Sequence, residues 1–227
     1  MTHIIDRQQR ELPLLLTDER VLTKTICECN DKFIDIATVN NEYIKMLPVP
    51  SQPFVDITHN AGLVHSSFIR SLLFKRLEAA VNNFNRIYKG VDKDSKIVFM
   101  VFEGLRSLED CRNAGPYKDV DIYNEQKATG GFVSFRLFDE SIDEFLDLGE
   151  VDSDITKVYV TFSKHLTAVQ KRNRTYLLHA CAMAGLVNYP LEWWTFCFGT
   201  QYYSYYTDNR VAIFDKIERN SQIVKTD

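Results

Sequence analysis

The sequence predicts an α+β fold in a single domain, residues 1–227, with a central antiparallel sheet flanked by helices. Its 227 residues are 45% hydrophobic, which is enough apolar material for one substantial core. Two segments have apolar residues at helical spacing, and shorter apolar runs between them have the composition of strands. These elements follow no regular β-α-β rhythm, which favours an antiparallel sheet over a parallel one.

The predicted helices cover residues 67–88 and 168–185. In the first, apolar residues recur at helical spacing, as expected of a long amphipathic helix: Phe68, Leu72, Leu73, Leu77, Ala80, Val81 and Phe84. The second stops at Gly185, because glycine adopts the left-handed backbone conformation that often ends a helix.

The predicted strands are a short run at 32–36 and longer runs at 96–102, 132–138 and 191–198. The run at 96–102 is rich in β-branched and aromatic residues, which indicates a buried strand, and the chain must turn at Glu103-Gly104. The run at 132–138 alternates, so Phe132, Ser134 and Arg136 should share one face of the sheet. An acidic loop, 139–154, follows it.

The composition excludes several classes of protein. A net charge of −4 with no basic cluster argues against nucleic-acid binding. No window approaches the roughly 18 apolar residues that cross a bilayer, and the N-terminus lacks the features of a signal peptide. The five cysteines form no paired framework, so we expect reduced thiols in a cytoplasmic protein. The Cys27-x-Cys29 pair is only a weak metal motif.

Four blocks of the sequence resemble, in order, the D-alanyl-D-alanine dipeptidase family of zinc peptidases. The family's D-G/A-Y-R-P reads E-G-L-R-S at 103–107, and its S-x-H-x-x-G-x-A-V-D reads E-Q-K-A-T-G-G-F-V-S at 125–134. A helix ending M-x-x-x-G-F is matched at 173–186, and E-W-W-H-F-x-Y-G-D-Q reads E-W-W-T-F-C-F-G-T-Q at 192–201. An upstream stretch, 61–70, is also similar. The resemblance covers about residues 35–215 and implies a dipeptidase-like fold.

The resemblance also implies that the zinc ligands have been lost. The two histidines and the aspartate that hold zinc in the family fall at Lys127, Thr195 and Ser134. An ammonium repels a cation and neutral hydroxyls bind zinc poorly, so we expect no metal and no cofactor. Without zinc, a bound water is not acidified, and conventional dipeptidase chemistry is not expected.

Two functional positions of the family are retained. Glu192 matches the general acid/base, and Arg106 matches the arginine that stabilises the oxyanion. Lys127 should place its ammonium opposite Glu192. This pair is either a salt bridge that repairs the fold or an acid/base pair with mutually shifted pKa values.

The predicted catalytic residues are therefore Glu192, Lys127 and Arg106. Cys197 should face the same side as Thr195 and is either a nucleophile or a buried apolar side chain. The tryptophans are either ligand contacts or core. The predicted substrate-binding residues are Arg106, Glu125, Ser134, Trp193, Trp194, Thr195 and Cys197.

These residues predict a metal-independent enzyme that acts on a small amino acid, dipeptide or amide. Two alternatives stay open: a pseudoenzyme that binds an amino-acid or peptide ligand, and a dipeptidase with unconventional metal ligands. The expected partner is a small amino-acid or peptide-like molecule, with no nucleic acid and no membrane. The sequence leaves the substrate, the reaction and the oligomeric state open.

Overall fold

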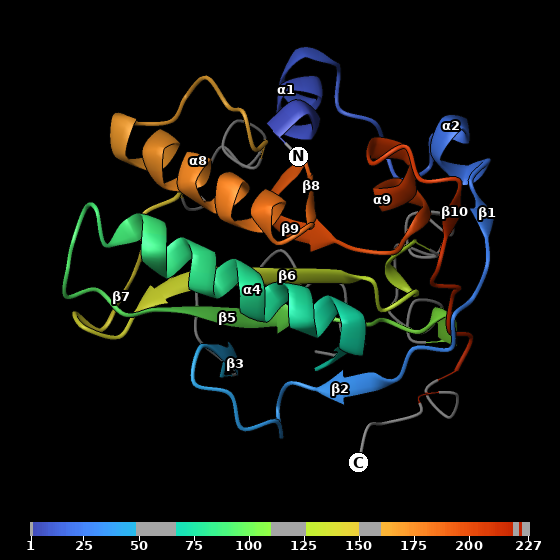
Figure 1. Ribbon diagram of the computed structural model, residues 1–227, viewed down its shortest axis with the longest axis horizontal. Coiled ribbons are helices and arrows are strands. Elements are labelled where there is room, and N and C mark those ends of the chain that lie inside the picture. The colour runs from blue at the N-terminus through green and yellow to red at the C-terminus, as the bar shows by residue number, and fades with distance from the viewer. Residues whose placement is uncertain (1, 49–66, 110–125, 150–159, 220–222, 224–227) are drawn as a thin grey trace.

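The computed structural model describes residues 2–48, 67–109, 126–149, 160–219 and 223 (Figure 1). Its helices are α1 Thr2–Arg10, α2 Glu19–Leu22, α4 Ser71–Tyr88, α8 Ala168–Met183 and α9 Gln201–Tyr206. Its strands are β1 Thr25–Ile26, β2 Phe33–Asp35, β3 Ile44–Met46, β4 Phe68–Arg70, β5 Ile97–Glu103, β6 Phe132–Asp139, β7 Glu144–Phe145, β8 Val187–Tyr189, β9 Glu192–Cys197 and β10 Val211–Ala212.

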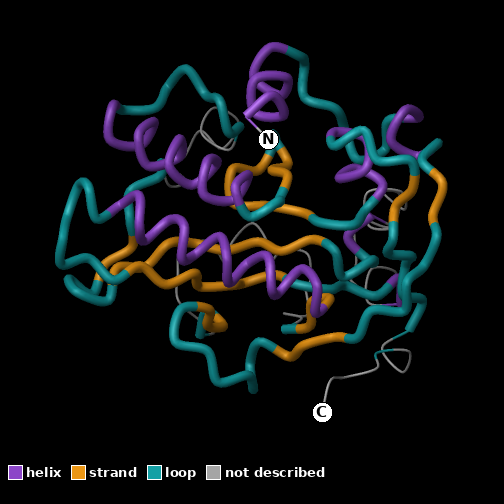
Figure 2. Tube along the Cα trace, in the orientation of Figure 1, coloured by secondary structure: helices purple, strands orange, loops and turns teal. Residues whose placement is uncertain are grey.

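The central sheet has six strands in the order β3-β5-β6-β9-β8, with β7 paired to β6. All neighbours are antiparallel except β3 and β5, which run parallel. The long helices α4 and α8 pack against each other across one face of this sheet (Figures 1 and 2). The predicted combination of helices with a largely antiparallel sheet is therefore confirmed.

The main core lies between the sheet and these two helices. A row of stacked rings crosses three neighbouring strands: the ring centroids of Phe99 and Phe135 are 4.3 Å apart, and those of Phe135 and Phe196 are 5.4 Å apart. All three side chains are fully buried. Burial of each such side chain stabilises the fold by roughly 1.5–3 kcal/mol. A slipped register would separate the rings, so this row favours the observed pairing of the central strands.

Sequence periodicity predicted the bounds of α8 closely and the start of α4 less closely. Helix α8 begins at a capping box formed by Thr167 and Gln170, and the chain leaves it through Gly185 at φ 82°. The first helix was predicted from residue 67, but α4 begins at Ser71. Residues Phe68–Arg70 instead form β4, which pairs with β2. The apolar pattern runs through both elements, so periodicity alone did not separate them.

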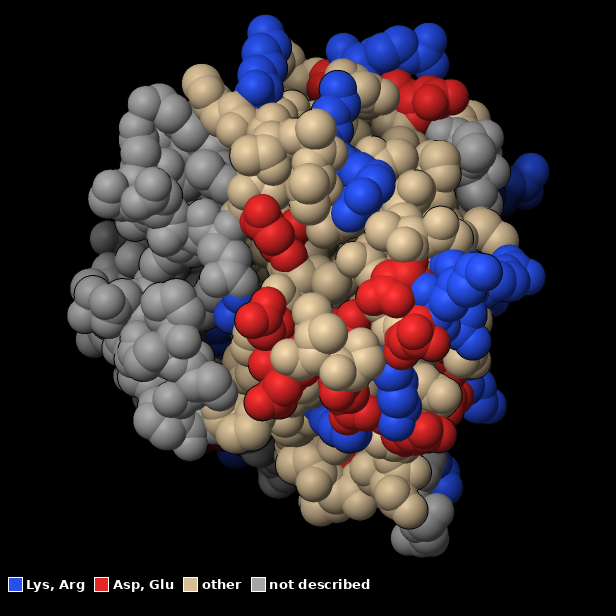
Figure 3. Space-filling view, turned by 90° about the vertical axis from the view of Figure 1, so that its left-hand side faces the viewer, with Lys and Arg blue, Asp and Glu red and all other residues tan. Residues whose placement is uncertain are grey.

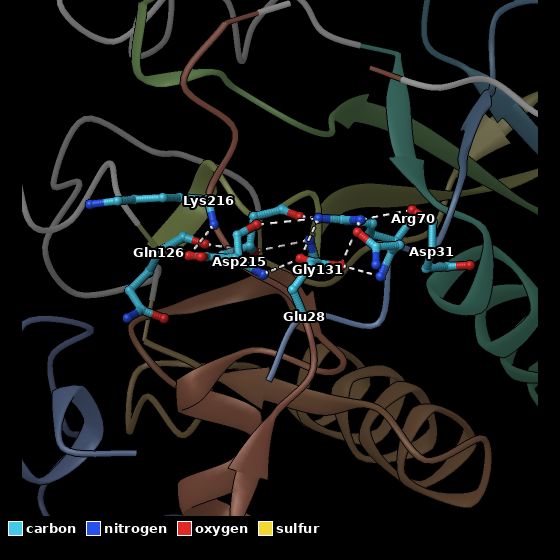
Figure 4. Close-up of polar contacts among 9 residues, drawn as sticks. Glu28, Asp31, Arg70, Gln126, Gly131, Asp215 and Lys216 are labelled. Carbon is cyan, nitrogen blue, oxygen red and sulfur yellow. Dashed lines mark hydrogen bonds and ion pairs between the residues drawn. The ribbon is translucent and has the colours of Figure 1, made fainter. Parts of the chain in front are cut away.

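Arg70 joins several segments that are far apart in the sequence (Figure 4). Its guanidinium lies between the rings of Phe33 and Phe214, 4.5 and 5.0 Å from their centroids. It forms an ion pair with Glu28 and donates to three backbone carbonyl oxygens, those of Asp31, Thr129 and Asp215. The N-terminal segment, the turn before β6 and the C-terminal segment are thereby held together.

Within the described ranges, no helix combines the length and apolar character needed to cross a membrane.

Candidate functional site

A row of polar side chains crosses the sheet on the face away from α4 and α8. Glu103 pairs with Ser134 across β5 and β6, and Ser134 pairs with Thr195 across β6 and β9. Residues 97, 99 and 101 of β5 pack in the helix-covered core, so strict alternation would also direct Glu103 toward the helices. A register shift between Val101 and Glu103 turns the carboxylate to the opposite face, as a β-bulge does.

Lys127 reaches this row from the short segment that precedes β6. Four residues separate Lys127 from the strand and the last two are glycines; Gly130 has φ 68°, a conformation that L side chains rarely adopt. A Cβ at Gly131 would lie 2.7 Å from the carbonyl oxygen of Phe198, so the backbone is too close for a side chain. The Arg70 side chain holds this turn through the Thr129 carbonyl, and the Lys127 side chain is directed toward the sheet.

The ammonium of Lys127 bridges two carboxylates. Its Nζ lies 3.1 Å from Glu103 Oε2 and 3.3 Å from Glu192 Oε2. The same two oxygens are joined by hydroxyls: Glu103 Oε2 to Ser134 Oγ at 3.0 Å, Ser134 Oγ to Thr195 Oγ1 at 2.8 Å, and Thr195 Oγ1 to Glu192 Oε2 at 2.7 Å. These five residues form a closed polar ring, which we call the Lys127 ring.

Arg106 extends the ring at one corner. Its Nη2 forms an ion pair with Glu103 Oε1, so Glu103 binds a different cation through each oxygen. The side chains of Lys127, Arg106 and Glu103 are 6%, 12% and 16% exposed, and that of Glu192 is 20% exposed. Two cations and two carboxylates are therefore gathered where water provides little screening.

The surroundings hold Glu103 in its charged form. Burial by itself would raise the pKa of this carboxyl group. The charges of Lys127 and Arg106, with hydrogen bonds from Lys127 and Ser134, outweigh burial, and the pKa lies below its ordinary value. Glu103 is thus an anchor for both cations of the site.

The structure brings together five of the residues singled out from the sequence: Glu192, Lys127, Arg106, Ser134 and Thr195. It adds Glu103, which was recognised only as the end of a strand. The missed signal was its place in the E-G-L-R-S block, three residues before Arg106. Glu125 lies outside the described residues.

The two tryptophans belong to the main core and not to the ring. Trp193 and Trp194 are 2% and 8% exposed, and their rings meet edge to face at 5.5 Å. The guanidinium of Arg174, from α8, lies 5.1 Å from the Trp193 ring centroid. The structure therefore favours packing in the core, the alternative interpretation of this pair, over contact with a ligand.

Cys197 is also buried, in a second apolar cluster with Phe132, Val187 and Tyr202. Burial raises the pKa of its thiol to about 12, although a hydrogen bond with Thr200 works in the opposite direction. A thiol of this kind is not a nucleophile at neutral pH. Of the two roles predicted for Cys197, the structure favours the buried apolar side chain.

The donor set does not suit a zinc ion. At the three positions that the resemblance equates with zinc ligands stand an ammonium and two hydroxyls, and the ammonium already binds the nearby carboxylates. The described part of the chain contains no cluster of three histidine, cysteine or acidic side chains that could hold a metal. The site instead suits proton transfer and the binding of a charged group.

The fold and site thus define an α+β protein with a buried, charge-paired polar ring on one face of its sheet. No protein-family model matches the chain, and no curated protein matches its sequence significantly. The likeness to D-alanyl-D-alanine dipeptidases rests on the sequence blocks quoted above.

Proposed function

We propose that this protein is a metal-independent enzyme that acts on a small amino acid, dipeptide or amide through acid/base chemistry at the Lys127 ring. The observation that carries the proposal is the position of the Lys127 ammonium, between Glu103 and Glu192. In a scaffold derived from a zinc dipeptidase, this ammonium would supply the positive charge that the metal once supplied.

Each residue has a role that its chemistry supports. Glu192 is the more exposed of the two carboxylates and is the group that exchanges a proton with the substrate. Lys127 stabilises negative charge that develops beside it. Arg106 binds a carboxylate or an oxyanion, and its bond to Glu103 fixes its direction.

A second candidate is a pseudoenzyme that binds an amino-acid or peptide ligand. The observation that favours it is the mutual pairing of all four charges, which lets the ring persist as a structural unit. In that case the surviving Arg106 and Glu192 recognise a ligand without transforming it.

Turnover of a panel of D- and L-dipeptides and amino-acid amides, followed by proton NMR with and without EDTA, tests the proposal. We expect chelator-resistant turnover that Glu192→Gln abolishes, because the amide keeps a hydrogen-bond acceptor for Thr195 but cannot exchange a proton. Glu140→Gln is the control: it removes a glutamate that also pairs with a lysine, Lys96, but lies outside the ring.

Each outcome of the panel separates the candidates. Binding by the wild type without turnover supports the pseudoenzyme. Turnover that EDTA removes supports a dipeptidase with unconventional ligands. Full activity in Glu192→Gln contradicts the proposed chemistry.

A further inference from the structure

The Lys127 ring contains fewer hydroxyl protons than contacts between oxygen atoms. Three oxygen–oxygen contacts link Glu103 to Glu192: 3.0 Å to Ser134, 2.8 Å between the hydroxyls, and 2.7 Å from Thr195. Each is a hydrogen-bond distance and needs one proton. Serine and threonine carry one hydroxyl proton each, and an ionised carboxylate carries none. Two protons therefore serve three contacts when both glutamates are ionised.

The protons on Lys127 do not correct this shortage. Two of them are directed to Glu103 Oε2 and Glu192 Oε2, and a proton on nitrogen does not lie between the two oxygens of any of these three contacts. With both carboxylates ionised, one of the three contacts would bring two oxygen lone pairs together. All three contacts become hydrogen bonds when one glutamate carries a proton.

We propose that the ring holds one such additional proton and that Ser134 and Thr195 relay it between Glu192 and Glu103. Placed on Glu192, the proton completes a chain in which each group donates to the next: Glu192 to Thr195, Thr195 to Ser134, and Ser134 to Glu103. Placed on Glu103, it completes the same chain in the opposite direction. Both arrangements satisfy every contact in the row.

The transfer conserves protons at every oxygen of the relay. The O–H bond of Glu192 breaks as Thr195 accepts its proton, Thr195 passes its own proton to Ser134, and Ser134 passes its own to Glu103. One carboxylic acid and one carboxylate are present before and after. The cations Lys127 and Arg106 both contact Glu103, which favours Glu103 as the carboxylate and Glu192 as the resting acid.

The relay gives Glu192 two chemical roles, and this use of it rests on the proposed function. With the proton on Glu192, the residue is a general acid. With the proton on Glu103, Glu192 is a general base. The cross-strand pairing of Ser134 with Thr195 provides the path between these states inside the protein.

Infrared spectroscopy of the resting protein tests the relay without any substrate. A protonated carboxyl group has a C=O band apart from that of a carboxylate, and uniform ¹³C labelling of glutamate assigns the band to glutamate. At neutral pH we expect one such band in the wild type and its loss in Glu192→Gln. Other charged or titratable groups near this proton are Glu103, Lys127, Arg106 and the phenol of Tyr189.

Thr195→Val distinguishes a relay from simple packing. It removes one hydroxyl and two contacts, which leaves the Ser134 proton sufficient for the remaining contact, so the band should disappear. Thr195→Ser restores the hydroxyl and should restore the band. Thr161→Val is the matched control, because Thr161 is buried with its hydroxyl bonded to Asn188, outside the ring.

Ser134→Ala provides the same readout should Thr195→Val fail to fold. Absence of a glutamic acid band from the wild type at neutral pH would overturn the proposal, as would a band that persists unchanged in Thr195→Val or Ser134→Ala. Because no substrate is present, the relay can fail while the proposed function stands, and the reverse also holds.

Discussion

Replacement of Lys127 by methionine should destabilise the fold strongly. Methionine keeps the approximate size of the side chain but removes the ammonium that Glu103 and Glu192 share. The buried Glu103 carboxylate then loses one of its two cations and keeps Arg106, while Glu192 loses a charged hydrogen-bond donor. The side chains of Lys127 and Glu192 are only 6% and 20% exposed, so solvent cannot replace the lost interaction fully.

The magnitude follows from this burial. Removal of one partner of a buried ion pair costs about 3–5 kcal/mol, and Arg106 keeps the expected loss near the lower end. For a chain of this size, 1 kcal/mol corresponds to about 2–4 °C in Tm, which gives a decrease of roughly 6–20 °C. Glu192→Gln should cost much less, alone or combined with Lys127→Met, because the relay proposed above leaves Glu192 as an uncharged acid, which glutamine resembles in size and charge.

Lys96→Met is the matched control, because Lys96, like Lys127, forms ion pairs with two glutamates. Lys96 also bridges two glutamates, Glu42 and Glu140, each at 2.9 Å, but its side chain is 39% exposed. It lies directly before β5 in the sequence. Figure 3 shows a face of the molecule on which acidic and basic side chains are interspersed. Because exposed ion pairs are screened by water, its Tm should change little.

Differential scanning calorimetry of wild type, both single variants, the double variant and the control decides the matter. The reasoning would be refuted if Lys127→Met unfolded at the wild-type temperature. It would also be refuted if Glu192→Gln lowered the Tm as much as Lys127→Met does.

Three further predictions concern metal, pH and thiol reactivity. Elemental analysis should find no stoichiometric zinc in the purified protein. Zinc binding should require the joint replacement Lys127→His, Ser134→Asp and Thr195→His. Tight zinc binding by any one of these single variants would show that other residues supply ligands. Because the folded protein holds the pKa of Glu103 below its ordinary value of 4.5, the resulting stabilisation is present above pH 4.5 and disappears as the pH falls through the folded value. The Tm advantage of the wild type over Glu103→Gln should therefore shrink below pH 4.5, and a constant difference would contradict this. Cys197, with its thiol pKa near 12, should react with a thiol reagent only after unfolding, whereas the exposed Cys27 and Cys29 should react in the native protein.

The sequence predicted the long elements because their patterns arise from one packing surface. The residues of α4 that face the core repeat at helical spacing, and α8 has clear signals at both ends. The short strands were harder to predict, because two or three residues give no period to read. Their positions depend on pairing with distant strands, which a local pattern does not contain.

The candidate site was predicted through the resemblance, and the backbone geometry adds Glu103 to it. The aligned motifs predicted a site containing Lys127, Ser134, Thr195 and Glu192, and these residues lie together in the structure. Glu103 could not be placed by alternation, because a register shift reverses the side of the strand on which it lies. The burial of Cys197 depends on a cluster built from several elements, so its position beside Thr195 in the sequence gave no indication of its surroundings.

The contacts of Arg70 bear on how the chain can be shortened. A fragment limited to residues 35–215, the span of the family resemblance, would lack Glu28 and the Asp31 carbonyl, which both bind the Arg70 guanidinium. That guanidinium also holds the Thr129 carbonyl, two residues from Lys127. Removal of the N-terminal residues would thus loosen the turn that positions the Lys127 ammonium beside Glu103 and Glu192. A minimal fragment chosen by sequence similarity alone would retain every residue of the Lys127 ring and lose part of its support.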